Sequence, residues 1–213
     1  MFTAQEITNL KSKEKIVMLT AYDYTLAKIM DNLVDLILVG DSMAMVVLGH
    51  KDTTEIKIED LLQATKSVSK GAKNTFIVGD MPLGSYNNNE EALISATHFI
   101  NAGAHAVKIE KNPSIAKFLT ENKIKVMGHV GLTPQTITDF KVQGKDDTSA
   151  KQILQEAKEL ENSGCFSIVL ECIPIDLAKE ITNSISIPTI GIGAGPNCDG
   201  QVLVTHDLLG LFE

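Results

Sequence analysis

Acidic side chains stand at the ends of several short apolar runs, where they could form a cation site with a base beside it. The acids and their runs are Asp41 in LILVGDS, Asp80 in TFIVGDMP, Glu110 in AVKIE and Glu171 in SIVLEC. Carboxylates that gather in one place repel one another unless a cation or a substrate lies among them. Hard divalent cations prefer carboxylate oxygens, and Mg²⁺ takes one or two of them from a protein. The sequence therefore indicates a divalent-cation site, with a turn or helix cap as the alternative for a single aspartate.

Glu171 is a candidate general base, because it ends the very apolar run SIVLE. Burial disfavours the charged form of a carboxyl group, which would raise its pKa from about 4.3 towards the range that suits proton abstraction. The alternative is that Glu171 caps the helix expected near Pro174.

Two basic side chains share these runs. Lys108 and Glu110 lie two positions apart in VKIE, so they face the same side of a strand. A buried lysine needs an anion, so Lys108 either pairs with Glu110 or holds a substrate carboxylate. His129 lies between Gly128 and Gly131, and it is either a core histidine or a site residue that something approaches closely.

The runs alternate with helix-like segments along the whole chain, which predicts a parallel sheet. Strands are expected at 15–23, 36–42, 75–82, 106–110, 125–131, 167–172 and 188–195, with 141–144 as a possible eighth. Eight strand–helix units make a (β/α)8 TIM barrel, whose chemistry lies at the carboxyl ends of the strands. A doubly wound sheet is the alternative. Since composition does not change along the chain, we expect one domain over residues 1–213.

Composition excludes several classes of protein. The net charge of −8 argues against nucleic acid or an anionic membrane as the main partner. There is no apolar run of the length that spans a bilayer, and the first 15 residues lack the apolar core of a signal peptide. Three cysteines without C-x-x-C spacing favour a reducing cytoplasm and make a zinc site unexpected.

Longer motifs are more specific than these patterns. TAYDYTLAKI, ILVGDSMAMVVLGH, VKIE, GHVGLTPQ, KVQGK, VLECIP and IPTIGIGAGPNCDGQVLV occur in this order. Together they strongly resemble the ketopantoate hydroxymethyltransferase (3-methyl-2-oxobutanoate hydroxymethyltransferase) family, over about residues 16–211. The resemblance implies a barrel of the phosphoenolpyruvate mutase and isocitrate lyase superfamily. It also implies transfer of a hydroxymethyl group from 5,10-methylenetetrahydrofolate to 3-methyl-2-oxobutanoate, giving 2-dehydropantoate, in the first step of pantothenate synthesis.

The resemblance also implies roles for single residues. The family's Mg²⁺ ligands fall on Asp41, Asp80 and Glu110. Its keto-acid contacts fall on Asp41, Ser42, Asp80, Lys108 and the active-site histidine, His129. Its proton acceptor falls on Glu171. In this chemistry Mg²⁺ stabilises the enolate that forms when a base removes the C3 proton of the keto acid. The family forms ring-like homo-oligomers, commonly decamers, so a homo-oligomer is expected here.

Several segments depart from the family pattern. TITDF (136–140) is short and lacks the usual glycines, the paired glycines after VKIE are absent, and Lys145 replaces an arginine. Family members continue for tens of residues beyond LLGLFE, so part of the C-terminal helices is expected to be missing. Two alternatives stay open, namely another Mg²⁺-dependent lyase of the superfamily and a non-enzymatic ligand-binding barrel.

Overall fold

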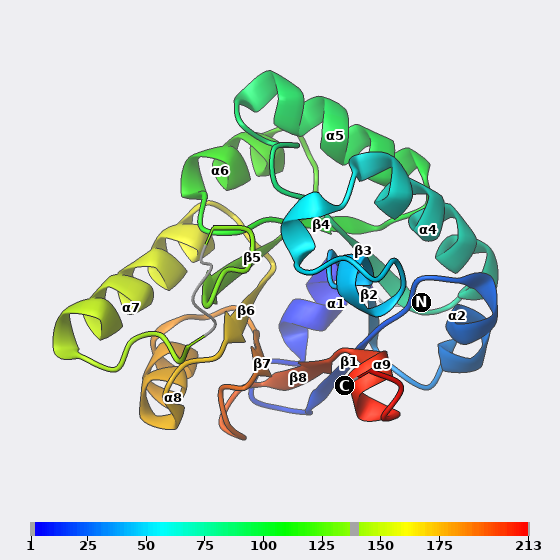
Figure 1. The fold of residues 1–213 in the computed structure, drawn as a ribbon. Helices are drawn as coiled ribbons and strands as arrows, with labels where there is room; N and C mark the ends of the chain where they lie inside the picture. Colours follow the sequence, from blue (N-terminus) through cyan, green and yellow to red (C-terminus); the bar gives the residue numbers. More distant parts are fainter. Residues whose placement is uncertain (1–2, 137–140, 213) are drawn as a thin grey trace.

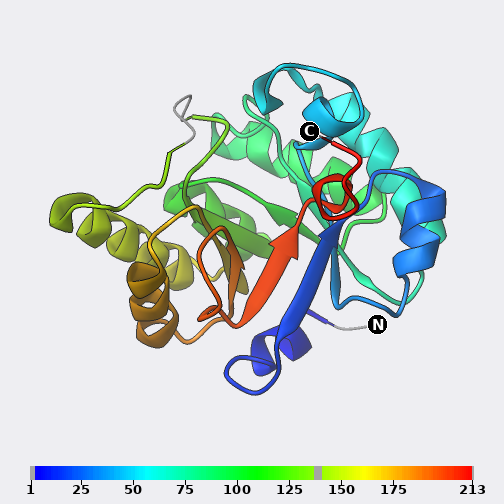
Figure 2. The ribbon, with the colours of Figure 1, turned by 60° about the horizontal axis from the view of Figure 1, so that its bottom comes forward.

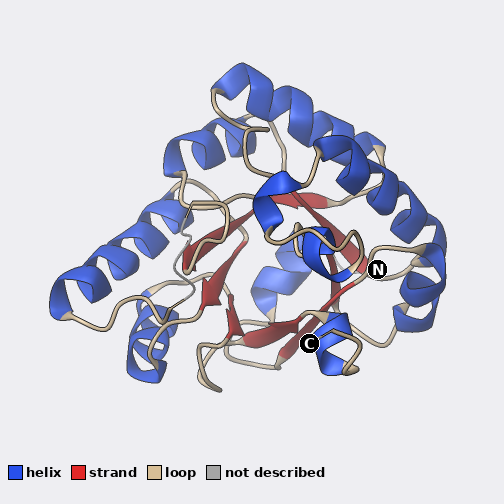
Figure 3. Ribbon diagram, in the orientation of Figure 1, coloured by secondary structure: helices blue, strands red, loops and turns tan. Residues whose placement is uncertain are grey.

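The chain folds as a closed barrel of parallel strands surrounded by helices (Figures 1 and 3). The structure is a computed structural model that describes residues 3–136 and 141–212. Within these residues eight strands follow one another around the barrel in chain order, and the last pairs with the first. They are β1 (Ile16–Thr20), β2 (Leu36–Val39), β3 (Phe76–Asp80), β4 (Ala106–Lys108), β5 (Val126–Gly131), β6 (Ser167–Glu171), β7 (Thr189–Ile192) and β8 (Gly200–Leu203).

Helices precede, connect and follow the strands, and several of them begin at a residue whose side chain caps the first turn. In chain order they are α1 (Ala4–Asn9), α2 (Tyr24–Met30), α3 (Met43–Val46), the 3₁₀ helix η1 (Thr53–Glu55), α4 (Ile58–Gly71), α5 (Asn89–Asn101), α6 (Pro113–Glu121), α7 (Asp147–Asn162), α8 (Ile175–Ser184) and α9 (Thr205–Leu208). The Asn88 side chain accepts a hydrogen bond from the Glu91 amide at the start of α5, and Pro113 occupies the first turn of α6. None of these helices, in the described ranges, is long and apolar enough to cross a membrane.

The predicted barrel is confirmed, but one strand prediction is wrong. Residues 141–144 form a loop, and the eighth strand is β8, which pairs with both β7 and β1. The pattern hides this strand because it is four residues long and alternates between buried and exposed positions. A strand buried on both faces reads as an apolar run, whereas GQVL does not.

The amino-terminal end of the barrel is closed by α1, a helix that was not predicted from the sequence. Ala4 and Ile7 of this helix are buried in the same cluster as Ile16 of β1, Phe76 of β3 and Phe166, which directly precedes β6. Figure 2 shows α1 below the strands, at the end opposite the C-terminus. The carboxyl ends of the strands therefore form the open mouth, which is where barrels of this type carry their chemistry.

Candidate active site

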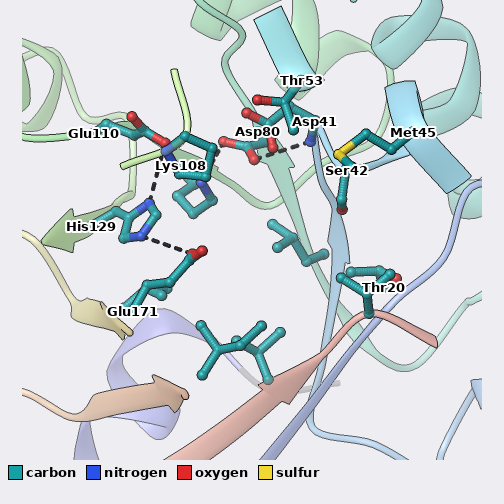
Figure 4. Close-up of a pocket in the computed structure, with 16 residues that line it drawn as sticks. Thr20, Asp41, Ser42, Met45, Thr53, Asp80, Lys108, Glu110, His129 and Glu171 are labelled. Atoms are coloured by element: carbon teal, nitrogen blue, oxygen red, sulfur yellow. Dashed lines mark hydrogen bonds and ion pairs between the residues drawn. The ribbon is translucent and has the colours of Figure 1, made fainter. Parts of the chain in front are cut away.

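A pocket of about 180 Å³ lies at the carboxyl ends of the strands (Figure 4). Its lining includes every residue that the sequence singled out for a role, namely Asp41, Ser42, Asp80, Lys108, Glu110, His129 and Glu171. An apolar wall, which includes Leu38, Val169 and Val202, faces these polar groups. The pocket is smaller than the roughly 300–1,000 Å³ of drug-sized sites, so it suits a small molecule with one charged end and one apolar end.

Asp41, Asp80 and Lys108 form one buried group. Lys108 Nζ lies 2.8 Å from Asp80 Oδ1, and the Asp41 backbone N–H donates to Asp80 Oδ2 at 3.2 Å. Burial, followed by the charge of Asp80, raises the pKa of Asp41 to about 7, and burial also raises the pKa of Asp80. Burial lowers the pKa of Lys108, but the surrounding carboxylates outweigh it and the net direction is upward. The group therefore strongly favours a positive charge in its midst.

Asp41 lies in a turn, but the helix-cap alternatives and the Lys108–Glu110 pair are not seen among the described residues. In the described part of the chain, Lys108 makes its ion pair with Asp80 and not with Glu110. Neither aspartate caps a helix, since α3 has no side-chain cap and α5 is capped by Asn88. Likewise no described side chain caps α8, so Glu171 has no capping role there.

His129 lies between two acids at the ends of β4 and β6. Its Nδ1 is 3.5 Å from Glu110 Oε1, and its Nε2 is 3.1 Å from Glu171 Oε2 (Figure 4). Burial and the charge of Lys108 lower the pKa of His129, but the two carboxylates outweigh them and raise it to about 9. The two carboxylates on either side of its ring therefore favour the protonated form of His129.

Several polar atoms of the pocket lack a hydrogen-bond partner among the described residues. These include both carboxylate oxygens of Glu110 and the hydroxyl of Thr53. The contact of Glu110 with His129 is thus an ion pair in distance without the alignment of a hydrogen bond. An unsatisfied buried polar group costs about 1–3 kcal/mol, so we expect these atoms to be satisfied by a ligand.

The backbone bends sharply after each acid that contacts His129. Lys111, which follows Glu110, has φ +40°, and Cys172, which follows Glu171, has φ +49°. Both amides still bond to the neighbouring strand, since Lys111 N–H donates to His129 O at 3.1 Å and Cys172 N–H donates to Ile192 O at 2.8 Å. Such φ values are strained for residues with a Cβ and gather at functional sites.

The sequence reasoning missed four polar residues of this region. They are Tyr22, Thr53, Tyr86 and Gln135. The Tyr22 and Ser42 hydroxyls are 2.8 Å apart, and Thr53 lines the pocket from η1. All four follow the carboxyl end of an observed strand by two to fourteen residues, although Tyr22 falls inside the strand predicted at 15–23. The rule that such loops face the mouth of a barrel was therefore the signal that could have found them.

The loop departures fall in different places. Residues 137–140 of the TITDF segment lie outside the described residues. The segment after VKIE passes directly into α6, whose first residue is Pro113. Lys145 is exposed in the loop before α7.

Solved structures of low identity share the fold. A phosphonopyruvate hydrolase in complex with oxalate and Mg²⁺ superposes with a TM-score of 0.76 at 12% identity, covering 99% of this chain and 83% of that one. A 2,3-dimethylmalate lyase, a member of the PEP mutase/isocitrate lyase superfamily, gives a TM-score of 0.72 at 14% identity, covering 99% and 84%. These likenesses confirm the architecture.

Sequence comparison is more specific. The protein from Syntrophus aciditrophicus named 3-methyl-2-oxobutanoate hydroxymethyltransferase is 50% identical over 99% of this chain and 81% of its own length. The protein of the same name from Clostridium kluyveri is 53% identical over 95% of this chain and 75% of its own length. The family profile described as ketopantoate hydroxymethyltransferase matches residues 1–213. The chain belongs to the ketopantoate hydroxymethyltransferase family.

Proposed function

We propose that this chain, a hydroxymethyltransferase by family, transfers a hydroxymethyl group from 5,10-methylenetetrahydrofolate to 3-methyl-2-oxobutanoate, giving 2-dehydropantoate. Identity of about 50% to curated relatives of that name over nearly the whole chain supports the reaction. The observation that carries it in the structure is the placement of His129 and Glu171 beside Asp41, Asp80 and Lys108 in one small pocket.

The residues of this pocket fit a Mg²⁺ ion that acts together with its substrate. No group of three or more His, Cys, Asp or Glu side chains in residues 3–136 and 141–212 is arranged to hold a metal ion by itself. Mg²⁺ does not need such a group, because it is usually bound by one or two carboxylates and completes its shell with water or substrate oxygens. Asp41 and Asp80 would be those ligands, and the unpartnered Glu110 oxygens would accept from water around the ion. Bound there, the ion supplies Lewis-acid polarisation of the keto oxygen.

The keto acid would bind with its charged end at the polar wall and its branched alkyl end at the apolar wall. Lys108 supplies a buried positive charge near the substrate carboxylate and offsets the charge of Asp80. Ser42, whose hydroxyl is fixed by Tyr22, lies at the start of α3 beside Asp41. Apolar side chains on the opposite wall exclude water from the reacting carbon.

Glu171 would be the base. Its carboxylate is partly exposed at the pocket and lies 3.1 Å from His129 Nε2 as an ion pair. It takes the proton from C3 of the keto acid, and the electron pair of that C–H bond moves into the enolate. Both C–N bonds of the folate methylene bridge break: the enolate carbon replaces one nitrogen and the oxygen of a water molecule replaces the other. The proton taken by Glu171 and one proton of the water end on the two nitrogens, which gives tetrahydrofolate. The positive charge of His129 balances Glu110 throughout.

We also propose three broader properties of this chain. It would act in the cytoplasm, as a single domain, and in a homo-oligomer, with a decamer as the expected form. Free Cys165, Cys172 and Cys198 fit a reducing compartment. Analytical ultracentrifugation measures the oligomeric state directly.

Proton–deuterium exchange at C3 of 3-methyl-2-oxobutanoate, followed by NMR with Mg²⁺ and with or without tetrahydrofolate, tests the chemistry. We expect metal-dependent exchange in the wild type and about a 10³-fold loss in Glu171→Gln, since a general base contributes roughly 10²–10⁴-fold. Glu180→Gln, an exposed site on α8, is the matched control. Absence of exchange from folded wild-type protein would instead support a ligand-binding barrel.

A further inference from the structure

Gln135, in the loop after β5, is a buried amide with a complete set of partners. It is only 4% exposed. Its Nε2 donates to Asp41 Oδ2 at 3.1 Å and to the backbone carbonyl of Met81 at 3.0 Å. Its Oε1 accepts from the Tyr86 hydroxyl at 2.6 Å. Gln135 therefore joins the loop after β5 to the ends of β2 and β3.

The partners of Gln135 dictate which way its amide group faces. The Tyr86 hydroxyl accepts the Glu110 backbone N–H at 3.4 Å, so its own proton is free to go to Gln135 Oε1. The Met81 carbonyl can only accept. A flipped amide would place its oxygen against both that carbonyl and the Asp41 carboxylate, which are all acceptors. The NH₂ group of Gln135 must therefore face Asp41.

The two aspartates of the pocket are held in contrasting ways. Asp80 is held by Lys108, a cation that offsets its charge. Asp41 is held by Gln135, a neutral donor that engages one carboxylate oxygen. A neutral donor fixes the plane of a carboxylate and leaves its negative charge in place. Gln135 thus fixes the orientation of the Asp41 carboxylate in the pocket without neutralising its negative charge. A carboxylate that binds a cation needs both properties.

We propose that Gln135, with Tyr86 behind it, is a positioning residue that orients Asp41 for divalent-cation binding. The inference rests on the proposed function, because it assumes that Asp41 is a ligand of the cation. Partners that orient metal ligands in this way change metal affinity by about 10–100-fold when they are removed.

Mn²⁺ binding, measured by electron paramagnetic resonance on the full chain with and without 3-methyl-2-oxobutanoate, tests the proposal. Gln135→Met keeps the length of the side chain and loses its donors, so we expect about 10–100-fold weaker Mn²⁺ binding. Tyr86→Phe removes the bond that orients the amide, and we expect a smaller loss of a few-fold, roughly. Thr136→Val is the matched control, since its hydroxyl lies 3.0 Å from that of Thr133 in the same loop.

The outcomes separate this inference from the proposed function. Wild-type Mn²⁺ affinity in folded Gln135→Met would overturn the inference, while C3 exchange by the wild type would leave the proposed function standing. If Gln135→Met does not fold, Tyr86→Phe decides: a loss larger than in Thr136→Val supports the inference, and wild-type affinity overturns it. A wild type that neither binds Mn²⁺ nor exchanges the C3 proton would overturn both.

Discussion

Both ends of the barrel bury acidic side chains, but the pKa values of these acids are shifted in opposite directions. At the amino-terminal end, Asp199 accepts from Lys11 Nζ at 2.9 Å, from the Ser12 N–H at 3.1 Å and from the Thr189 N–H at 3.0 Å. Burial raises the pKa of Asp199, but the Thr189 amide and Lys11 outweigh it and the net direction is downward. At the mouth, burial raises the pKa of Asp41 to about 7.

The contrast distinguishes an acid whose hydrogen bonds stabilise the fold from acids whose oxygens are left for a ligand to bind. Asp199 has a donor for each of its carboxylate oxygens, so its ionised form is stabilised in the folded chain. Glu110 is as well buried, at 4% exposed, but neither of its oxygens has a hydrogen-bond partner in the part that the structure describes. A partly satisfied polar group is destabilising, and such groups gather at the functional end of barrels.

The largest expected effect follows from substitution at the mouth. Asp41→Asn keeps the shape and the bond with Gln135 but loses the charge, so we expect loss of keto-acid and cation binding and at least about a 10²-fold loss of C3 exchange. Stability at pH 8 should stay the same or rise, because an ionised buried carboxylate with a neutral donor is costly. Exchange by NMR and scanning calorimetry measure the two quantities. A large fall in Tm would mean that Asp41 serves the fold.

The reverse result is expected at the closed end. Asp199→Ala leaves Lys11 without its partner, and we expect a loss of about 3 kcal/mol in the free energy of unfolding with C3 exchange retained. Because the pKa of Asp199 is lowered in the folded state, its contribution is present at pH 7 and is lost as pH falls below the ordinary value of 3.8 and through the folded one. Urea titrations at pH 7 and pH 3 test this, with the exposed Asp207→Ala as control. A stability difference that does not shrink at the lower pH would contradict the assignment.

The smallest effect is expected at Thr53. Thr53→Val keeps the volume and removes a buried hydroxyl that has no partner among the described residues. If a ligand satisfies this hydroxyl, we expect Tm to stay or rise slightly, and the Kd of the keto acid with Mg²⁺ to rise by about 5–10-fold. Isothermal titration calorimetry measures this. Unchanged affinity would place Thr53 outside the ligand's contacts.

Sequence predicts this molecule well where chemistry is local. The apolar runs predict the strands, and the acids that follow them predict which end of the barrel carries the site. Asp41, Asp80 and Glu171 could therefore be placed in one pocket from the sequence alone. Their roles as ligands and base stay predictions. The partner of each group was less predictable. Lys108 pairs with Asp80 across neighbouring strands and not with Glu110 on its own run, because strand register decides which side chains meet.

The remaining differences have physical reasons as well. The strand β8 is short and has a weak local pattern, so its pairing partners decide it. The helix α1 is also short, but it begins with a capping box formed by Thr3 and Glu6, which is a local signal that the sequence prediction did not use. Gln135 and Tyr86 are polar residues in loops, and sequence alone gives such residues no partner. Only the closed barrel brings the loop after β5 against the end of β2.

The left-handed backbone at Lys111 and Cys172 has a consequence for sequence variation. Each position follows an acid of the site and holds φ near +40 to +50°. Residues branched at Cβ are strongly disfavoured there, whereas glycine, asparagine and aspartate accept such values readily. The range of residues that can replace Lys111 or Cys172 is therefore set by the main chain and not by amine or thiol chemistry. In a library of variants at these two positions, stability would depend first on branching at Cβ and only then on side-chain charge.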